Sequence, residues 1–216
     1  MTTWSEYASR TRSTKIGLAH LYAKQRWKEW TLASGSIYKT YVRYIVSAVQ
    51  NGLTDLVEHT TEVSLPSGKF YFKPGTKELF VNIGPNPITT NVIFTYKLCF
   101  STTPLNLPHD LASGFDTEWE PRLKDIGDIK LELDFENQGI ALETNSSCSF
   151  YNDDGYFDDI FDVLIFENQR AIFYSYGLEI PVSERRVIFD GFMETKSFSS
   201  TEVKFTLKDQ FKRLRD

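Results

Sequence analysis

Five aspartates lie within ten residues of the stretch SFYNDDGYFDDIFD, residues 149–162. They are Asp153, Asp154, Asp158, Asp159 and Asp162. Carboxylates at this density could hold a calcium ion, or the magnesium ion of an enzyme that acts on phosphates. The helix-loop-helix calcium loop needs oxygen ligands at its first and twelfth positions and a glycine at its sixth.

The spacing around Gly155 argues against such a calcium loop. With Gly155 at the sixth position, the first and twelfth positions fall on Phe150 and Phe161, which offer no ligand oxygen. An irregular calcium site remains an alternative, because calcium tolerates varied oxygen geometry. Asp154-Gly155 is typical of a tight turn, since both residue types accept left-handed backbone. We therefore expect a strand, this turn and about one turn of helix, with no metal and no other cofactor.

Other residues with catalytic potential are scattered. The three histidines, His20, His59 and His109, stand far apart, and the chain has no phosphate-binding glycine loop and no serine nucleophile elbow. The acidic row Glu132, Asp134, Glu136 alternates with apolar residues, which is typical of the solvated face of a strand. We expect no catalytic residues and no enzymatic activity.

The tryptophans offer a different kind of chemistry, because exposed indole rings can stack on sugars. The four are Trp4, Trp27, Trp30 and Trp119. In an aromatic-rich β protein such residues more often belong to the core. A sugar-binding surface therefore stays open as an alternative.

Composition narrows the class of protein. The chain has 216 residues, a formal net charge of -5 and two cysteines. An acidic chain is unlike a nonspecific nucleic-acid binder, and two cysteines make neither a disulfide framework nor a zinc site. The polar first residues lack a signal segment, and no apolar run reaches the ~20 residues that span a bilayer.

The elements that must position these groups are mostly strands separated by turns. We expect strands at residues 15–30, 37–49, 53–63, 70–72, 79–83, 91–100, 129–136, 140–150, 171–176, 186–192, 196–198 and 203–207. Residues 15–30 carry both helical and alternating spacing, and we assign them to a strand. Strands spaced about ten residues apart favour an all-β fold, an antiparallel β-barrel or sandwich with short helices. The aperiodic, proline-containing segment 101–118 predicts a connection between a β module at 1–100 and a second domain at 119–216.

The second half resembles the hub proteins at the tip of bacteriophage tails and of related contractile injection machines. The similarity lies in the order of short motifs over residues 119–216: IKLELDFEN and Gly139, SFYNDDGYFDDIF, ENQRAIFYSYG, IFDGFMET and VKFTLKDQFKRL. In that family a strand ends in an Asn-x-Asp-Gly-x-Phe turn, followed by an Ile-Phe-x-Gly strand and a strand closing in Lys-Asp or Arg-Asp. Family members often carry a second barrel, so this chain is either a minimal hub or part of a longer one.

The resemblance implies a structural protein of the virion, made in the host cytoplasm. Such hubs join the tail tube and distal tail ring to a central spike or fibre, and they assemble as trimers or sixfold rings. Acidic and basic patches would then meet between neighbouring subunits. The contact residues that we expect are Asp153, Asp154, Asp158, Asp159, Lys208, Lys212 and Arg213. The alternative function is a carbohydrate-binding β module of a host-adhesion device.

Overall fold

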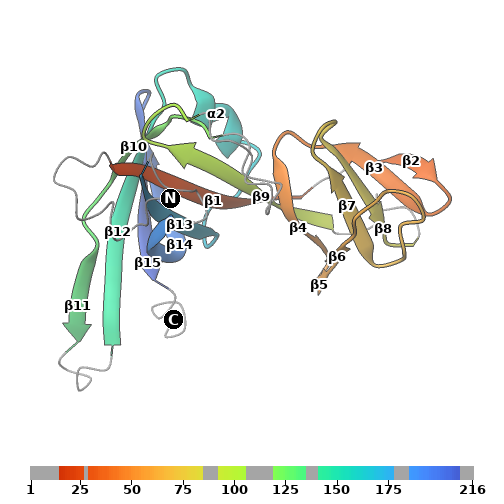
Figure 1. Ribbon diagram of the computed structural model, residues 1–216, viewed down its shortest axis with the longest axis horizontal. Helices are drawn as coiled ribbons and strands as arrows, with labels where there is room; N and C mark the ends of the chain where they lie inside the picture. The colour runs from red at the N-terminus through yellow and green to blue at the C-terminus, as the bar shows by residue number, and fades with distance from the viewer. Residues whose placement is uncertain are drawn as a thin grey trace. The chain divides into compact units, whose positions relative to one another are not determined.

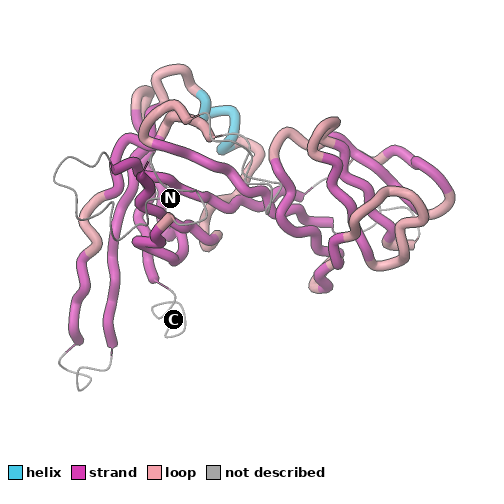
Figure 2. Tube along the Cα trace, in the orientation of Figure 1, coloured by secondary structure: helices cyan, strands magenta, loops and turns pink. Residues whose placement is uncertain are grey.

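The computed structural model describes residues 15–26, 29–84, 92–105, 119–134, 141–177 and 185–209. These residues are mostly strands, which confirms the all-β prediction (Figure 1). The described strands form open sheets dominated by antiparallel pairs, and none of these sheets closes into a barrel, so the sandwich-like alternative fits. The helix among the described residues, α2 (Tyr156–Phe161), is far too short to cross a membrane (Figure 2).

The chain divides into two compact units, one of residues 1–21 and 99–216 and the other of residues 22–98. This differs from the sequence-based division, because residues 15–21, the first part of the first strand, belong with the C-terminal half. β1 (Lys15–Arg26), a strand as expected, pairs with β13 (Arg170–Gly177), with Lys15 opposite Gly177 and Leu21 opposite Ala171. Most of the predicted connection at 101–118 lies outside the described residues.

The larger unit is an antiparallel sheet in the order β10-β12-β15-β14-β13-β1, and β11 pairs with β12. The bounds of its other strands are β10 (Leu123–Ile126), β11 (Lys130–Asp134), β12 (Ala141–Tyr151), β14 (Arg186–Phe198) and β15 (Glu202–Asp209). The predicted strands 186–192 and 196–198 are thus one continuous strand, β14. Alternate residues of β12 and β15 point inward, because Cys148, Phe150, Val203 and Phe205 are buried.

An aromatic cluster forms the core beneath α2. The ring centroid of Phe157, on α2, lies 5.6 Å from those of Phe100 and Phe150. Phe161 continues the cluster towards Phe166 at 5.5 Å. Aromatic side chains bury large apolar areas, so this cluster holds the short helix against the sheet.

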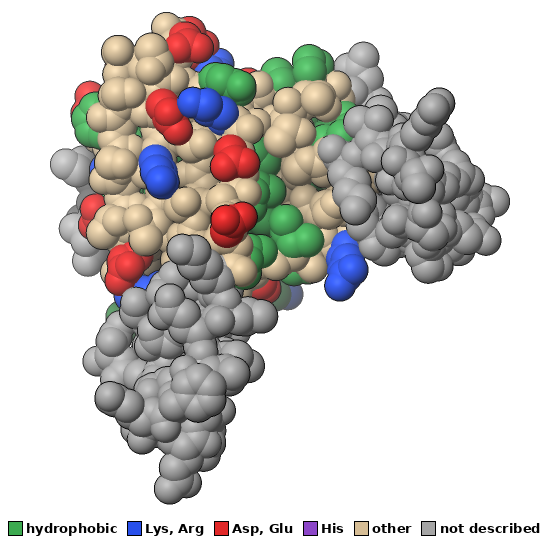
Figure 3. All heavy atoms as spheres, turned by 90° about the vertical axis from the view of Figure 1, so that its left-hand side faces the viewer, with side chains coloured by type: hydrophobic (Ala, Val, Ile, Leu, Met, Phe, Trp, Pro, Cys, Tyr) green, Lys and Arg blue, Asp and Glu red, His purple; other side chains and the backbone are tan. Residues whose placement is uncertain are grey.

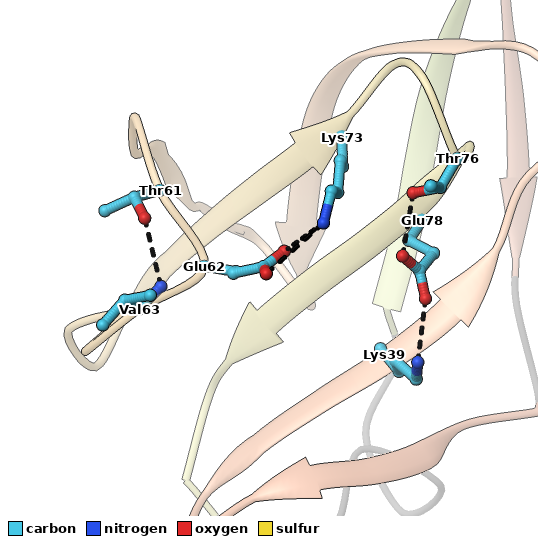
Figure 4. A network of polar contacts seen from close by, with 7 residues as sticks. All are labelled: Lys39, Thr61, Glu62, Val63, Lys73, Thr76 and Glu78. Carbon is cyan, nitrogen blue, oxygen red and sulfur yellow. Dashed lines mark hydrogen bonds and ion pairs between the residues drawn. The ribbon is translucent and has the colours of Figure 1, made fainter.

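The smaller unit contains a five-stranded sheet in the order β2-β3-β8-β7-β6 and a second group, β9-β4-β5. Its strands are β2 (Thr31–Ser34), β3 (Ile37–Tyr41), β4 (Ile45–Asn51), β5 (Thr54–Asp55), β6 (Val57–Glu58), β7 (Lys69–Lys73), β8 (Glu78–Asn82) and β9 (Val92–Ser101), which runs on into the larger unit. The polar face of the five-stranded sheet carries ion pairs of Lys39 with Glu78 at 2.8 Å and of Lys73 with Glu62 at 3.2 Å (Figure 4).

Two of the predicted strands of this unit are wrong in length. The strand expected at 37–49 is broken after Tyr41, because β3 pairs with β8 whereas β4 pairs with β9. The buried residue between them, Val42, donates its N–H to the Lys77 carbonyl at 2.9 Å. The strand expected at 53–63 is reduced to β5 and β6, because Ser64 has a positive φ of 57° and the preceding residues form turns. The Asn51-Gly52 hairpin is confirmed, with Asn51 opposite Thr54.

Gly191 in β14 packs closely against the neighbouring strand β15, and a substitution at this position tests that packing. A Cβ at this position would overlap the carbonyl oxygen of Lys208 on β15 and the ring of Phe189. We expect Gly191→Ala to lower the free energy of unfolding by about 1–3 kcal/mol through overpacking. Gly75→Ala, where nothing lies within 4 Å, is the matched control and should change it by less than about 0.5 kcal/mol. Equal urea midpoints for the two variants would contradict the close packing.

Candidate assembly site around the Asn152–Asp158 turn

Asn152 is fully buried at the end of β12, and its hydrogen bonds join three segments. Its side-chain Oδ1 accepts the Phe157 N–H at 2.8 Å, and its Nδ2 donates to the Asp158 carboxylate at 2.9 Å. Its backbone N–H donates to the Thr201 carbonyl, in the turn between β14 and β15, at 2.9 Å. One residue therefore ends the strand, accepts a hydrogen bond from a backbone N–H in the first turn of α2 and fixes the neighbouring turn.

Asp154 and Gly155 make the turn itself, as expected. Gly155 adopts left-handed backbone with φ 68° and directly precedes α2. The Asp154 carboxylate accepts two hydrogen bonds from the Arg122 guanidinium, at 2.7 and 2.6 Å, and another from the Tyr156 N–H at 3.2 Å. The guanidinium also lies 3.9 Å from the centroid of the Tyr156 ring. The predicted sequence of strand, turn and short helix is confirmed.

Arg122 compensates the negative charge of Asp154 in this turn. Its paired hydrogen bonds to Asp154 lower the pKa of that carboxyl to about 2. Asp154 also raises the pKa of Arg122. Such two-pronged contacts of arginine with carboxylate fix geometry as well as charge. Sequence reasoning missed Arg122, because it precedes Asp154 by 32 residues and no local pattern links the two.

Two of the five aspartates make hydrogen bonds or ion pairs within the protein. Asp154 is held by Arg122 and Asp158 by Asn152. Within the described part of the chain, no group of three or more histidine, cysteine, aspartate or glutamate side chains is arranged to hold a metal ion.

The expected contact residues lie at two ends of the larger unit. Asp153, Asp154, Asp158 and Asp159 are exposed on the turn and on α2. Lys208, near the end of β15, is buried and lies 3.6 Å from Glu194. Six residues of strand, about 20 Å, separate it from Glu202 at the start of β15, so Lys208 does not neutralise the acidic turn of its own subunit. Lys212 and Arg213 lie outside the described residues, and the subunit contact stays a prediction.

His20, Trp30 and Trp119 pack against other aromatic rings. Trp119 is buried and stacks on His20 with ring centroids 5.1 Å apart, and the Tyr174 hydroxyl lies 3.2 Å from His20 Nδ1. Trp30 is half-buried and meets Phe94 edge to face at 5.7 Å. Trp119 therefore has no open ring face for stacking on a sugar. Trp4, Trp27 and His109 lie outside the described residues, as does Glu136 of the acidic row.

No protein-family model, no curated protein and no solved structure matches this chain. The resemblance of the second half to tail-tip hubs therefore stays a prediction.

Removing the Asn152 side chain tests its part in the fold. We expect Asn152→Ala to lower the free energy of unfolding by about 2–4 kcal/mol, because the buried Phe157 N–H loses its partner. Asn152→Asp keeps the acceptor for Phe157 but brings a second carboxyl against Asp158. It should therefore destabilise the protein more at pH 7 than at pH 4 in urea denaturation. A loss below about 0.5 kcal/mol for Asn152→Ala would show that the turn forms without this amide.

Because the pKa of Asp154 is lowered in the folded protein, part of the free energy of unfolding depends on pH. Because its folded-state pKa, about 2, lies below the unfolded value near 3.9, this contribution is present above about pH 4 and is lost as the pH falls towards 2. We expect the wild type to lose more stability than Asp154→Asn over that interval, measured by denaturant titration at each pH. Arg122→Gln should raise the Asp154 pKa, read from carboxyl carbon shifts. Parallel acid profiles for the wild type and Asp154→Asn would refute the coupling.

Proposed function

We propose that the chain is a structural subunit of a bacteriophage tail tip or baseplate hub, without enzymatic activity of its own. It would link the tail tube and distal tail ring to a central spike or fibre, and it would assemble with copies of itself.

The observation that carries the proposal is the arrangement of the three motifs behind the family resemblance. The Asn-Asp-Asp-Gly-Tyr-Phe turn follows β12, the Ile-Phe-Asp-Gly run lies in β14, and Lys208-Asp209 closes β15. These three strands are neighbours in one sheet. Each motif also has a physical task there, because Asn152 is buried at the turn and Gly191 faces the carbonyl of Lys208. Motifs that meet in one sheet support a common fold more strongly than motifs scattered over a chain.

The charge distribution of the larger unit also suits a protein that meets its neighbours at both ends. The acidic turn lies beside the start of β15, and Lys208 lies near its end. If Lys212 and Arg213 add basic charge beyond Lys208, copies placed head to tail would bring opposite charges together. Among the side chains that Figure 3 colours, acidic and basic ones are interspersed.

Particle composition tests this function. We expect virus particles purified by density gradient from the strain that carries the gene to contain the chain in a fixed ratio to tail proteins. Disruption of the gene should give particles without complete tails, and a plasmid-borne copy should restore them. Intact, infectious tails produced without the chain would refute the proposal, whatever the purified chain does in solution.

A further inference from the structure

The hairpin that joins β4 to β5 turns at Asn51-Gly52, the one place in the sequence where glycine directly follows asparagine. Gly52 has a positive φ of 63°, and nothing lies within 4 Å of the position that a Cβ would take there. Leu53, the other residue of the turn, is fully exposed. The backbone nitrogen that follows the Asn51 side chain is therefore open to approach.

The polar groups of this turn are not held by hydrogen bonds from the described residues. No described carbonyl accepts the Gly52 N–H, and no described group binds the Asn51 side-chain amide. Asn82 differs, because its side-chain oxygen accepts the Ser36 hydroxyl at 3.0 Å and its amide nitrogen donates to the Leu65 carbonyl at 2.7 Å. An amide held in that way cannot turn towards its own backbone, whereas the amide of Asn51 can.

β5 holds the tip of this hairpin weakly. It forms two residue pairs with β4, one of them Asn51 with Thr54, and it pairs with no other described strand. Thr54 and Asp55 are both exposed. Segments with so few buried contacts open locally at a fraction of the free energy of global unfolding. Beyond the tip the chain is anchored, because the buried Leu56 donates its N–H to the Val49 carbonyl at 2.9 Å.

We propose that Asn51-Gly52 is a site of spontaneous deamidation. The Gly52 nitrogen loses its proton to a base in solution and attacks Cγ of Asn51. A bond from that nitrogen to Cγ forms, the bond from Cγ to Nδ2 breaks, and Nδ2 takes up a proton and leaves as ammonia. Water then opens the cyclic imide at either of its carbonyls, which leaves aspartate or isoaspartate at position 51. No oxidant or reductant is needed.

Glycine at the attacking position favours this reaction, because a β-carbon there would crowd the nitrogen and restrict the backbone. Asn168 provides the opposite case within the same chain. It is exposed, but the residue after it is Gln169, whose N–H donates to the Phe166 carbonyl at 3.0 Å. Exposure alone therefore favours reaction at Asn168, whereas access to the following nitrogen favours Asn51.

Conversion changes the sheet at its β5 edge. Either product places a negative charge at the end of β4, close in sequence to the exposed Asp55. Isoaspartate also adds one carbon atom to the backbone path between positions 51 and 52, which disturbs the pairing with Thr54. β4 stays paired with β9 from Ile45 onwards, so the change is confined to β5 and the turn.

Mass spectrometry of the full chain after incubation tests the site. Purified protein is held under native conditions at pH 5 and at pH 8 and then digested with trypsin. The peptide from Tyr44 to Lys69 contains Asn51 as its sole asparagine. We expect the mass gain of an amide-to-carboxylate conversion to grow with time in this peptide, and faster at pH 8, because the attacking nitrogen must lose its proton. A sample digested without incubation corrects for conversion during digestion, and isoaspartyl methyltransferase labels the isoaspartate product.

Two glycine variants supply a matched control. Nothing lies within 4 Å of an added Cβ at Gly52 or at Gly75. Gly52→Ala should slow the conversion of Asn51 several-fold, and Gly75→Ala should leave its rate unchanged. Circular dichroism shows whether both variants are folded.

Three results would overturn the assignment. Conversion of Asn168 before Asn51 would show that exposure alone decides. An Asn51 amide that persists in the native chain but converts in urea would show that the folded hairpin protects it. Equal rates in the wild type and in Gly52→Ala would exclude attack by the Gly52 nitrogen. The reaction needs only the chain and water, so none of these results bears on the proposed function.

Discussion

The burial of one amide, that of Asn152, is the constraint on which the larger unit depends. A helix as short as α2 cannot form alone, because the first hydrogen-bonded turn costs more conformational entropy than it returns. Asn152 supplies a partner for the Phe157 N–H and a donor for Asp158 before the helix has made any bond of its own. A fully buried amide without such partners would cost several kcal/mol, so position 152 and the first turn of α2 form together or not at all.

The aromatic core depends on these hydrogen bonds of Asn152. With its N–H held by Asn152, Phe157 is directed into the sheet, where its ring meets those of Phe100 and Phe150. The next turn of α2 brings Phe161 within 5.5 Å of Phe166. The cost of burying one polar group is thus offset by the apolar area of several rings. Gly155 makes the connection possible, because its left-handed backbone turns the chain three residues after Asn152.

Sequence reasoning succeeded where the determinants are local. Alternation over residues 203–207 reflects one buried face, and Gly155 after Asp154 specifies the turn through its left-handed backbone. It failed where a residue distant in the sequence determines the local structure or contact. Val42 ends β3 because the two flanking strands pair with different neighbours, and the residues between Ile37 and Val49 carry no sign of that. Arg122 and Asp154 are 32 residues apart, and the pairing of β1 with β13 joins residues 150 or more positions apart, so neither leaves a periodic signal.

The candidate site shows why charge counts alone mislead about assembly. Counted along the sequence, the turn carries five carboxylates, yet Arg122 holds Asp154 and Asn152 holds Asp158. Those contacts stabilise the subunit. Asp153 and Asp159, exposed on the turn and on α2, are therefore better placed than Asp154 and Asp158 to meet a neighbouring subunit.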